Sequence, residues 1–167
     1  MTSIAIQMSS SPRSKAFIRR SLNHKIHFEG RFGATYFITI CCREKGHNCL
    51  CRENISKEIF KTAAIYDDRQ LWYLELMLLM PDHLHALISI DGDASLSSTL
   101  GNFKRAMTKF AGIEWQRNFF DHRLRCDENF EKKAAYIRNN PVRSGLVMNE
   151  EKWPYVLDRT GIEVAVR

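Results

Sequence analysis

Met80-Pro81-Asp82-His83-Leu84-His85 is the stretch around which the rest of this 167-residue chain can be arranged. One apolar run, Leu71 to Met80, leads into it, and another, Ala86 to Ile90, follows it. Proline lacks the amide proton that a sheet ladder needs, so Pro81-Asp82 predicts a tight turn or a kink between two strands. Side chains alternate along a strand, so the two histidines point to one face and Leu84 points into a core. The stretch therefore predicts two imidazoles that project together from a strand.

The segments around this pair predict an α+β fold. We expect strands over Ala34–Cys42, Leu71–Met80 and His83–Ile90, and a fourth strand that includes Arg123–Arg125. We expect helices over Ile55–Asp67 with Asn54 as its cap, from Ser95 to Gly112, and from Asp127 to about Asn139. Asn140-Pro141 stops the last helix, because a residue before proline disfavours the helical region. This order predicts a ferredoxin-like antiparallel sheet with packed helices plus an extra C-terminal catalytic helix.

Composition and charge narrow the class of protein. Hydrophobic residues make up 44% of the chain, enough for a real core, and the formal net charge is +6. Residues 1–30 carry five basic residues against one acidic residue, and residues 101–125 carry six against two. We expect one domain over 31–160, a basic N-terminal extension over 1–30 and a tail over 161–167. A basic surface suits nucleic acid, although basic residues in a tail can also serve solubility alone.

Cysteine usage and hydropathy indicate where the protein works. Five cysteines are an odd number, which argues against a disulfide framework, and the first thirty residues lack an apolar signal segment. No stretch reaches the roughly 20 apolar residues of a membrane span. We therefore expect a cytoplasmic protein without a membrane partner. Cys41, Cys42, Cys49 and Cys51 are spaced CC and CxC, unlike the CxxC pairs of zinc ribbons, so buried strand cysteines and loop cysteines are the preferred interpretation.

The third expected helix carries chemistry beside its buried stripe. Phe130, Ala134 and Ile137 recur at helical spacing and form the stripe, and Tyr136 lies about a quarter turn away from it. Lys132 and Asn140 are four residues before and after Tyr136, so an ammonium, a phenol and an amide share one face. The two histidines could bind a divalent metal with the Asn140 amide oxygen as a third ligand, and Tyr136 could then attack a phosphodiester. Taken alone, each of these residues is as easily explained by packing.

The same residues carry a family resemblance. Met80-Pro81-Asp82-His83-Leu84-His85 resembles the "MPNHxH" signature of the single-tyrosine HUH transposases. The run from Tyr136 to Val147, YIRNNPVRSGLV, is similar to the "YIxxNPVRAGLV" signature of the REP-associated tyrosine transposases within that group. Trp115-Gln116-Arg117 and the run from Phe120 to Arg125 resemble the "WQRGFxDHxxR" segment, and Trp153-Pro154-Tyr155 resembles the family's ending. The likeness runs in the expected order from about Ala34 to Leu157.

This resemblance implies a transposase-type nickase that cleaves and rejoins single-stranded, hairpin-forming repeat DNA. It implies Tyr136 as the nucleophile of a covalent phosphotyrosine, and His83 and His85 as ligands of Mg²⁺ or Mn²⁺. Asn140 fits the family's polar position four residues after the tyrosine, with Asn139 as the fallback. Asp82, Asn118 and Ser144 depart from the signatures without removing a catalytic atom, and Asp82 could serve as an outer-shell partner of the metal. The protein is expected to act as a monomer or a homodimer.

Basic and aromatic residues are candidates for holding DNA. Lys104, Arg105 and Lys109 on the second helix could follow a phosphate backbone, with Arg117, Arg123 and Arg143 closer to the site. Trp115 and Phe119 either stack on unpaired bases or pack in the core. Two other functions stay open: a non-catalytic platform for single-stranded nucleic acid on a four-stranded sheet, and a metal-dependent hydrolase of small phosphodiesters.

Overall fold

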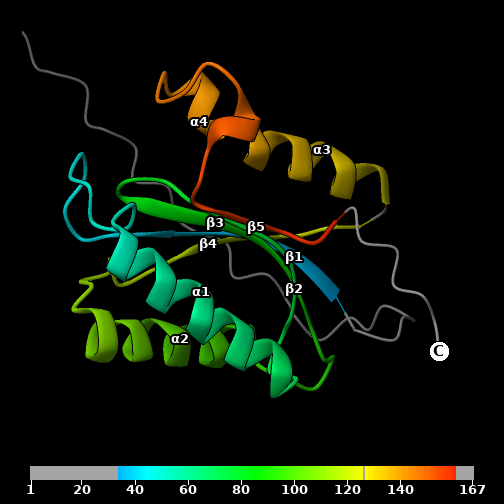
Figure 1. Cartoon of the computed structure of the whole chain (residues 1–167). Coiled ribbons are helices and arrows are strands. Elements are labelled where there is room, and N and C mark those ends of the chain that lie inside the picture. The colour runs from blue at the N-terminus through cyan, green and yellow to red at the C-terminus, as the bar shows by residue number, and fades with distance from the viewer. Residues whose placement is uncertain (1–33, 126, 161–167) are drawn as a thin grey trace, which may run out of the picture.

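The computed structural model describes residues 34–125 and 127–160 (Figure 1). The expected basic extension over 1–30 and the tail over 161–167 lie outside these residues. The elements in chain order are β1 (Ala34–Cys41), α1 (Glu53–Asp68), β2 (Tyr73–Leu79), β3 (His83–Ile90), α2 (Leu96–Ala111), β4 (Phe120–Arg123), α3 (Asp127–Arg138), α4 (Asn140–Arg143), a 3-10 turn η1 (Glu150–Lys152) and β5 (Val156–Asp158). No helix in the described part of the chain is both long and apolar enough to cross a membrane.

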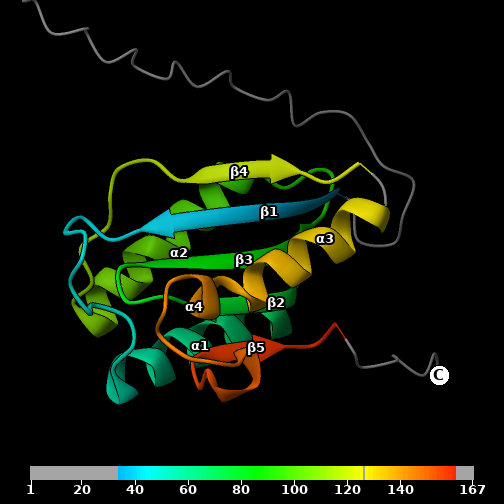
Figure 2. The ribbon, with the colours of Figure 1, turned by 90° about the horizontal axis from the view of Figure 1, so that it is seen from above.

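The strands form one antiparallel sheet in the order β4-β1-β3-β2-β5 (Figure 2). The first four strands in this order have the predicted ferredoxin-like arrangement, so the expected α+β fold is confirmed. The added edge strand β5 was not predicted, because three residues are too few to show a hydrophobic period. The hairpin between β2 and β3 is closed by a hydrogen bond from Met80 N to His83 O at 2.8 Å, so Pro81 and Asp82 form the predicted tight turn.

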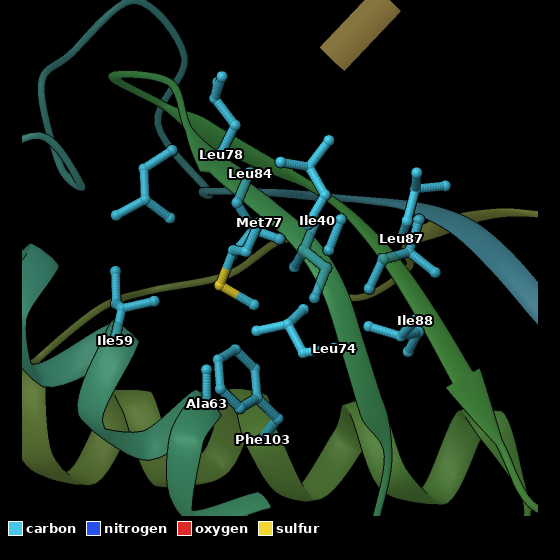
Figure 3. Packing of buried hydrophobic residues seen from close by; sticks show 14 of the residues in the cluster. Ile40, Ile59, Ala63, Leu74, Met77, Leu78, Leu84, Leu87, Ile88 and Phe103 are labelled. Atoms are coloured by element: carbon cyan, nitrogen blue, oxygen red, sulfur yellow. The ribbon is translucent and has the colours of Figure 1, made fainter. Parts of the chain in front are cut away.

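Two helices cover each face of the sheet. Helices α1 and α2 lie under one face, and α3 and α4 lie over the other (Figure 1). Alternation along β1 and β3 sends Ile40, Leu84 and Ile88 toward α1 and α2, where they are fully buried. Figure 3 shows Phe103 of α2 and Ile59 of α1 below these strands. This closed apolar layer holds the strands in register and so fixes what they present on the opposite face.

The ends of α2 follow from its sequence. Ser95 is the N-cap, and its hydroxyl oxygen accepts the amide of Ser98 at 3.3 Å. Gly112 ends the helix in the left-handed region with φ 66°, as expected for a glycine at this position. Leu100, Phe103 and Met107 of the predicted stripe are buried, whereas Phe110 is exposed. The predicted helix from Ser95 to Gly112 is therefore confirmed.

Several predicted boundaries are wrong. The α1 helix begins at Glu53, so Arg52 and not Asn54 is the N-cap residue. The β2 strand starts at Tyr73, because Trp72 turns inward and its indole donates to the carbonyl of Ala63 at 3.1 Å. The β4 strand covers Phe120–Arg123, so Arg123 belongs to it as predicted, but Leu124 and Arg125 lie beyond its end.

The predicted stop at Asn140-Pro141 holds only in part. The α3 helix ends at Arg138, and the short helix α4 starts at Asn140 with Pro141 in its first turn. Proline is tolerated there because the first turn of a helix needs no amide donor. The first helix thus ends two residues after Tyr136, and the chain continues in a second, short helix.

Candidate active site

The two histidines lie on the central strand β3, on the face that α3 covers. In the register with β1, His83 is opposite Cys41 and His85 is opposite Thr39. Their ring centroids are 4.9 Å apart, and the rings meet edge to face at 79°. The hydrophobic neighbour Leu84 points to the other face and is fully buried. The predicted pair of imidazoles on one face is therefore present.

A carboxylate orients His83. The Nδ1 atom of His83 lies 2.7 Å from Asp82 Oδ1, and Asp82 Oδ2 accepts the backbone amide of Gly46 at 2.7 Å. Partial burial raises the pKa of Asp82, but the hydrogen bonds from Gly46 and His83 outweigh it and lower the pKa overall. An ionised carboxylate can only accept, so Nδ1 of His83 donates in this hydrogen bond, and in the neutral ring the lone pair is then on Nε2. Asp82 therefore orients His83, and its role as an outer-shell partner of a metal stays a prediction.

A hydroxyl on the neighbouring strand holds His85. Thr39 Oγ1 lies 2.8 Å from Nδ1 of His85, and the ring of Phe37 stacks on the imidazole at 5.5 Å and 23°. Burial, helped by the nearby His83, lowers the pKa of His85 to about 3. His85 is therefore a neutral imidazole near pH 7, which is the form that binds a metal. In the tautomer in which Nδ1 donates to Thr39, the lone pair of His85 is on Nε2.

The α3 helix brings Tyr136 to this pair. Ala134 and Ile137 anchor the helix in the core, as predicted, and Tyr136 beside them is 39% exposed. The Tyr136 ring lies 5.9 Å from the ring of His85 and 5.9 Å from that of Phe37, measured between centroids. A phenol and two imidazoles from segments 51 residues apart in the chain, His85 to Tyr136, thus meet over the centre of the sheet.

Two cations flank the phenol ring. Lys133 Nζ lies 5.8 Å from the ring centroid of Tyr136, and the guanidinium carbon of Arg143 lies 5.2 Å from it. Arg143 was predicted near the site, but the predicted ammonium was that of Lys132. Lys133 contacts the ring because a residue three positions before the tyrosine also lies on its face of the helix. The site therefore has positive charge where a phosphate could approach.

Asn140 lies at the start of α4, four residues after Tyr136. Its side-chain nitrogen is buried and has no hydrogen-bond partner among the described residues. The oxygen and nitrogen of a side-chain amide are assigned from their hydrogen-bond partners, so the opposite orientation would put the oxygen of Asn140 in this unpartnered place. Asn139, the fallback, is exposed. No described contact joins Asn140 to either histidine, so its role as a metal ligand stays a prediction.

The donor set fits a divalent metal. Both Nδ1 atoms are engaged, by Asp82 and Thr39, which leaves an Nε2 atom on each ring for a metal. Among the residues that the structure describes, no three His, Cys, Asp or Glu side chains gather as a metal site. A further ligand to such a metal would therefore be an amide, a water or the substrate, which are ligands that Mg²⁺ and Mn²⁺ accept.

The predicted DNA-binding residues divide between the two faces. Arg143 lies at the site, Arg123 is on the edge strand β4, and Arg117 is exposed in the loop before it. Lys104, Arg105 and Lys109 are on α2, on the opposite face of the sheet (Figure 1). Lys104 Nζ donates to the carbonyls of Gln116 and Arg117 at 2.7 and 2.9 Å, so it also holds that loop. The structure does not bring the α2 residues to the histidines.

The four described cysteines are free thiols, and one of them, Cys41, lies opposite His83 in the register of β1 and β3. Cys42 and Cys51 are buried, and burial raises the pKa of each thiol to about 12. Cys41 and Cys49 are half-buried. Among the described residues, the cysteines form no group of three or more metal-ligating side chains.

Comparison with known proteins shows which proteins the chain is similar to. No family model matches the chain. A REP-associated tyrosine transposase of Escherichia coli is 26% identical over an alignment that covers 74% of this chain and 75% of that protein. An uncharacterised protein of Haemophilus influenzae is 28% identical, with 74% and 88% covered, and a putative REP-associated tyrosine transposase of that organism is 24% identical, with 74% and 78% covered.

A solved structure of a REP-associated tyrosine transposase bound to a REP hairpin has the same fold. Its TM-score to this chain is 0.69 at 24% identity, and the match covers 83% of this chain and 82% of that one. The chain is thus similar in sequence to REP-associated tyrosine transposases, and it has the fold of a solved structure of one.

Proposed function

We propose that the protein is a DNA nickase and strand transferase that cleaves and rejoins single-stranded, hairpin-forming repeat DNA through a phosphotyrosine at Tyr136. One observation carries this proposal: the Tyr136 ring lies 5.9 Å from the ring of His85, beside a second imidazole. A tyrosine that served only packing would not need a polar, partly open site. The hairpin DNA of the solved relative supports the choice of substrate.

His83 and His85 would hold Mg²⁺ or Mn²⁺ through their Nε2 atoms, with Asn140 as a further ligand. Bound there, the metal would supply Lewis-acid polarisation of the phosphodiester. The protein's contribution is to orient both imidazoles. Asp82 and Thr39 do this through their hydrogen bonds to the two Nδ1 atoms.

Tyr136 would form the covalent bond to the DNA. Its phenol oxygen attacks the phosphorus, a new oxygen–phosphorus bond forms, and the bond from phosphorus to one sugar oxygen breaks. The phenol proton goes to solvent and the departing strand leaves with a free hydroxyl group. Lys133 and Arg143 lie beside the ring, where their positive charge would attract the incoming phosphate. Attack by another hydroxyl end on the phosphotyrosine reverses these bonds and rejoins DNA.

The test is a denaturing-gel assay on a labelled single-stranded hairpin from the DNA that flanks the gene. We expect the wild type to form a metal-dependent protein–DNA adduct that a chelator abolishes. Tyr136→Phe should form no adduct, and His83→Ala should reduce it at least 100-fold, because one metal ligand and its carboxylate partner are uncoupled. Tyr155→Phe is the matched control, since Tyr155 packs on Trp153 at 5.4 Å, away from the histidines.

Two outcomes would overturn the proposal. Binding of the hairpin without any adduct, unchanged in Tyr136→Phe, would leave a non-catalytic single-stranded nucleic-acid-binding protein of ferredoxin-like fold. Turnover of small phosphodiesters that needs the metal but forms no covalent adduct would leave a hydrolase. Sedimentation with and without the hairpin would separate the monomer from the homodimer.

A further inference from the structure

A row of aromatic rings runs from Tyr136 to the edge of the sheet. Phe37 on β1 is its centre: its ring contacts Tyr136 at 5.9 Å, stacks on His85 at 5.5 Å, and meets Phe120 edge to face at 6.0 Å and 67°. Phe37 itself is buried. It therefore connects the candidate nucleophile to Phe120 on β4 by direct ring contacts.

Phe120 is open to solvent although it belongs to this row. It is 54% exposed and lies opposite Thr39, the residue that holds His85. The α3 helix packs on β3 and β2, and Figure 2 shows the edge strand β4 lying beyond both α3 and α4. No described helix therefore covers Phe120, and its ring is backed by Phe37 on one side only.

Exposure of one phenylalanine is ordinary and is no evidence by itself. Phe110 on α2 is even more exposed, at 62%, but it lies on the far face of the sheet, where Lys109 lies over its ring at 5.6 Å. The sequence suggested Trp115 and Phe119 as stacking residues, yet Trp115 is buried and Phe119 packs against the core. Phe120 is the exposed ring that contacts the row leading to Tyr136.

Positive charge lies over the same row. Lys133 Nζ is 4.9 Å from the ring centroid of Phe37 and 5.8 Å from that of Tyr136. An exposed ring beside cations is the combination that binds single-stranded nucleic acid, since bases stack on the ring while phosphates meet the charge. An acidic or purely apolar partner would use only part of this surface.

We propose that Phe120 stacks on an unpaired base of single-stranded DNA next to the phosphodiester that Tyr136 attacks. This inference rests on the proposed function and adds the residue that positions the strand. Stacking at the sheet edge fixes one nucleotide, so that the next phosphate lies over the histidines and the phenol. Phe120 is thus a positioning residue that contacts the substrate, and it takes no part in the bond changes.

The experiment uses the flanking hairpin with a single-stranded tail that carries 2-aminopurine at one tail position at a time, in chelator. We expect the full-length wild type to quench or shift the fluorescence at one or two adjacent positions. Phe120→Ala should lose that position-specific signal and bind the hairpin about 5- to 100-fold more weakly, the loss expected of one base stack. Phe120→Tyr should keep the signal, because it keeps the ring. Phe110→Ala should bind as the wild type does.

The adduct assay is then run on the same variants with metal. Phe120→Ala should form the adduct more slowly at subsaturating DNA and recover much of the rate at saturating DNA. A signal that survives in Phe120→Ala, or a loss that Phe120→Tyr does not rescue, overturns the inference. If the wild type forms no adduct but Phe120 still determines the fluorescence, the nickase proposal fails and the stacking site stands. If the wild type does not bind the hairpin at all, both fail.

Discussion

The two faces of the sheet are built from the same strands, but one forms an apolar core and the other carries polar side chains. On the face toward α1 and α2, β1 and β3 present Ile38, Ile40, Leu84, Ala86 and Ile88, all fully buried. On the face toward α3, the same strands present Thr39, His83 and His85 among apolar neighbours, and a polar network replaces simple packing. Alternation along each strand makes this division possible, because neighbouring residues point to opposite faces.

The contrast between the two faces indicates where the protein can tolerate polar side chains. The closed face has a continuous apolar layer, so its loss would cost stability. The face toward α3 is only partly covered and holds its polar side chains through partners on other elements, as Asp82 does with Gly46. We therefore expect changes on the closed face to affect unfolding, and changes on the other face to affect the chemistry.

The largest expected effect is on the closed face. Phe103→Ala should lower the free energy of unfolding by about 3–5 kcal/mol, because Phe103 is fully buried against Trp72 and Tyr66 and its removal leaves a cavity. Urea unfolding monitored by circular dichroism measures this change. Phe110→Ala on the same helix is the control, and its exposed site should keep the change within about 0.5 kcal/mol. Similar values for the two variants would contradict the division between the faces.

A smaller effect is expected from the hydroxyl that orients His85. Thr39→Val keeps the shape but removes the partner of His85 Nδ1, and we expect metal affinity and adduct formation to fall about 10- to 100-fold. Isothermal titration with Mn²⁺ and the gel assay report the two quantities separately.

Thr35→Val is the matched control for this change. Thr35 lies two residues earlier on the same strand, and its hydroxyl is 2.8 Å from that of Ser89. Both variants remove one hydroxyl from β1 on the α3 face, so both should cost a similar, small amount of stability. Equal activity losses in the two would mean that the hydroxyl near His85 acts through the sheet and not through the imidazole.

The smallest effect concerns the contact that ties α3 to β5. Arg138, at the end of α3, donates from Nε to Asp158 Oδ2 at 2.6 Å. Partial burial raises the pKa of Asp158, but hydrogen bonds from Arg138 and Thr160 outweigh it and lower the pKa overall. The lowered pKa stabilises the fold above the unfolded pKa of about 3.9, and this contribution is lost as the pH falls through the folded pKa.

Asp158→Asn should therefore unfold more easily than the wild type at pH 7, by less than about 1 kcal/mol, as is usual for a partly exposed pair. The difference should shrink as the pH is lowered toward 3. Thermal unfolding of both proteins across this range measures it. A difference that grows on acidification would contradict the assigned direction of the pKa shift.

Much of the fold could be predicted because its signals are local. The periodic apolar residues of α2, the alternation of β1 and β3, and the turn at Pro81 each depend on neighbouring residues only. Predictions failed where a segment is short or where a distant residue decides its limits. The limits of β4 are set by its pairing with β1, and β5 was missed because its three residues are defined by pairing with β2.

The sequence by itself determined that His83 and His85 share a face, and that Tyr136 stands off the buried stripe of its helix, because both follow from the geometry of a single element. Only the tertiary structure decided that these elements meet at 5.9 Å, that Thr39 holds His85, and that Lys133 rather than Lys132 lies at the phenol. It also placed the basic residues of α2 on the far face and left Phe120 exposed beside the site. These relations depend on register and packing between segments far apart in the chain, which no local period encodes.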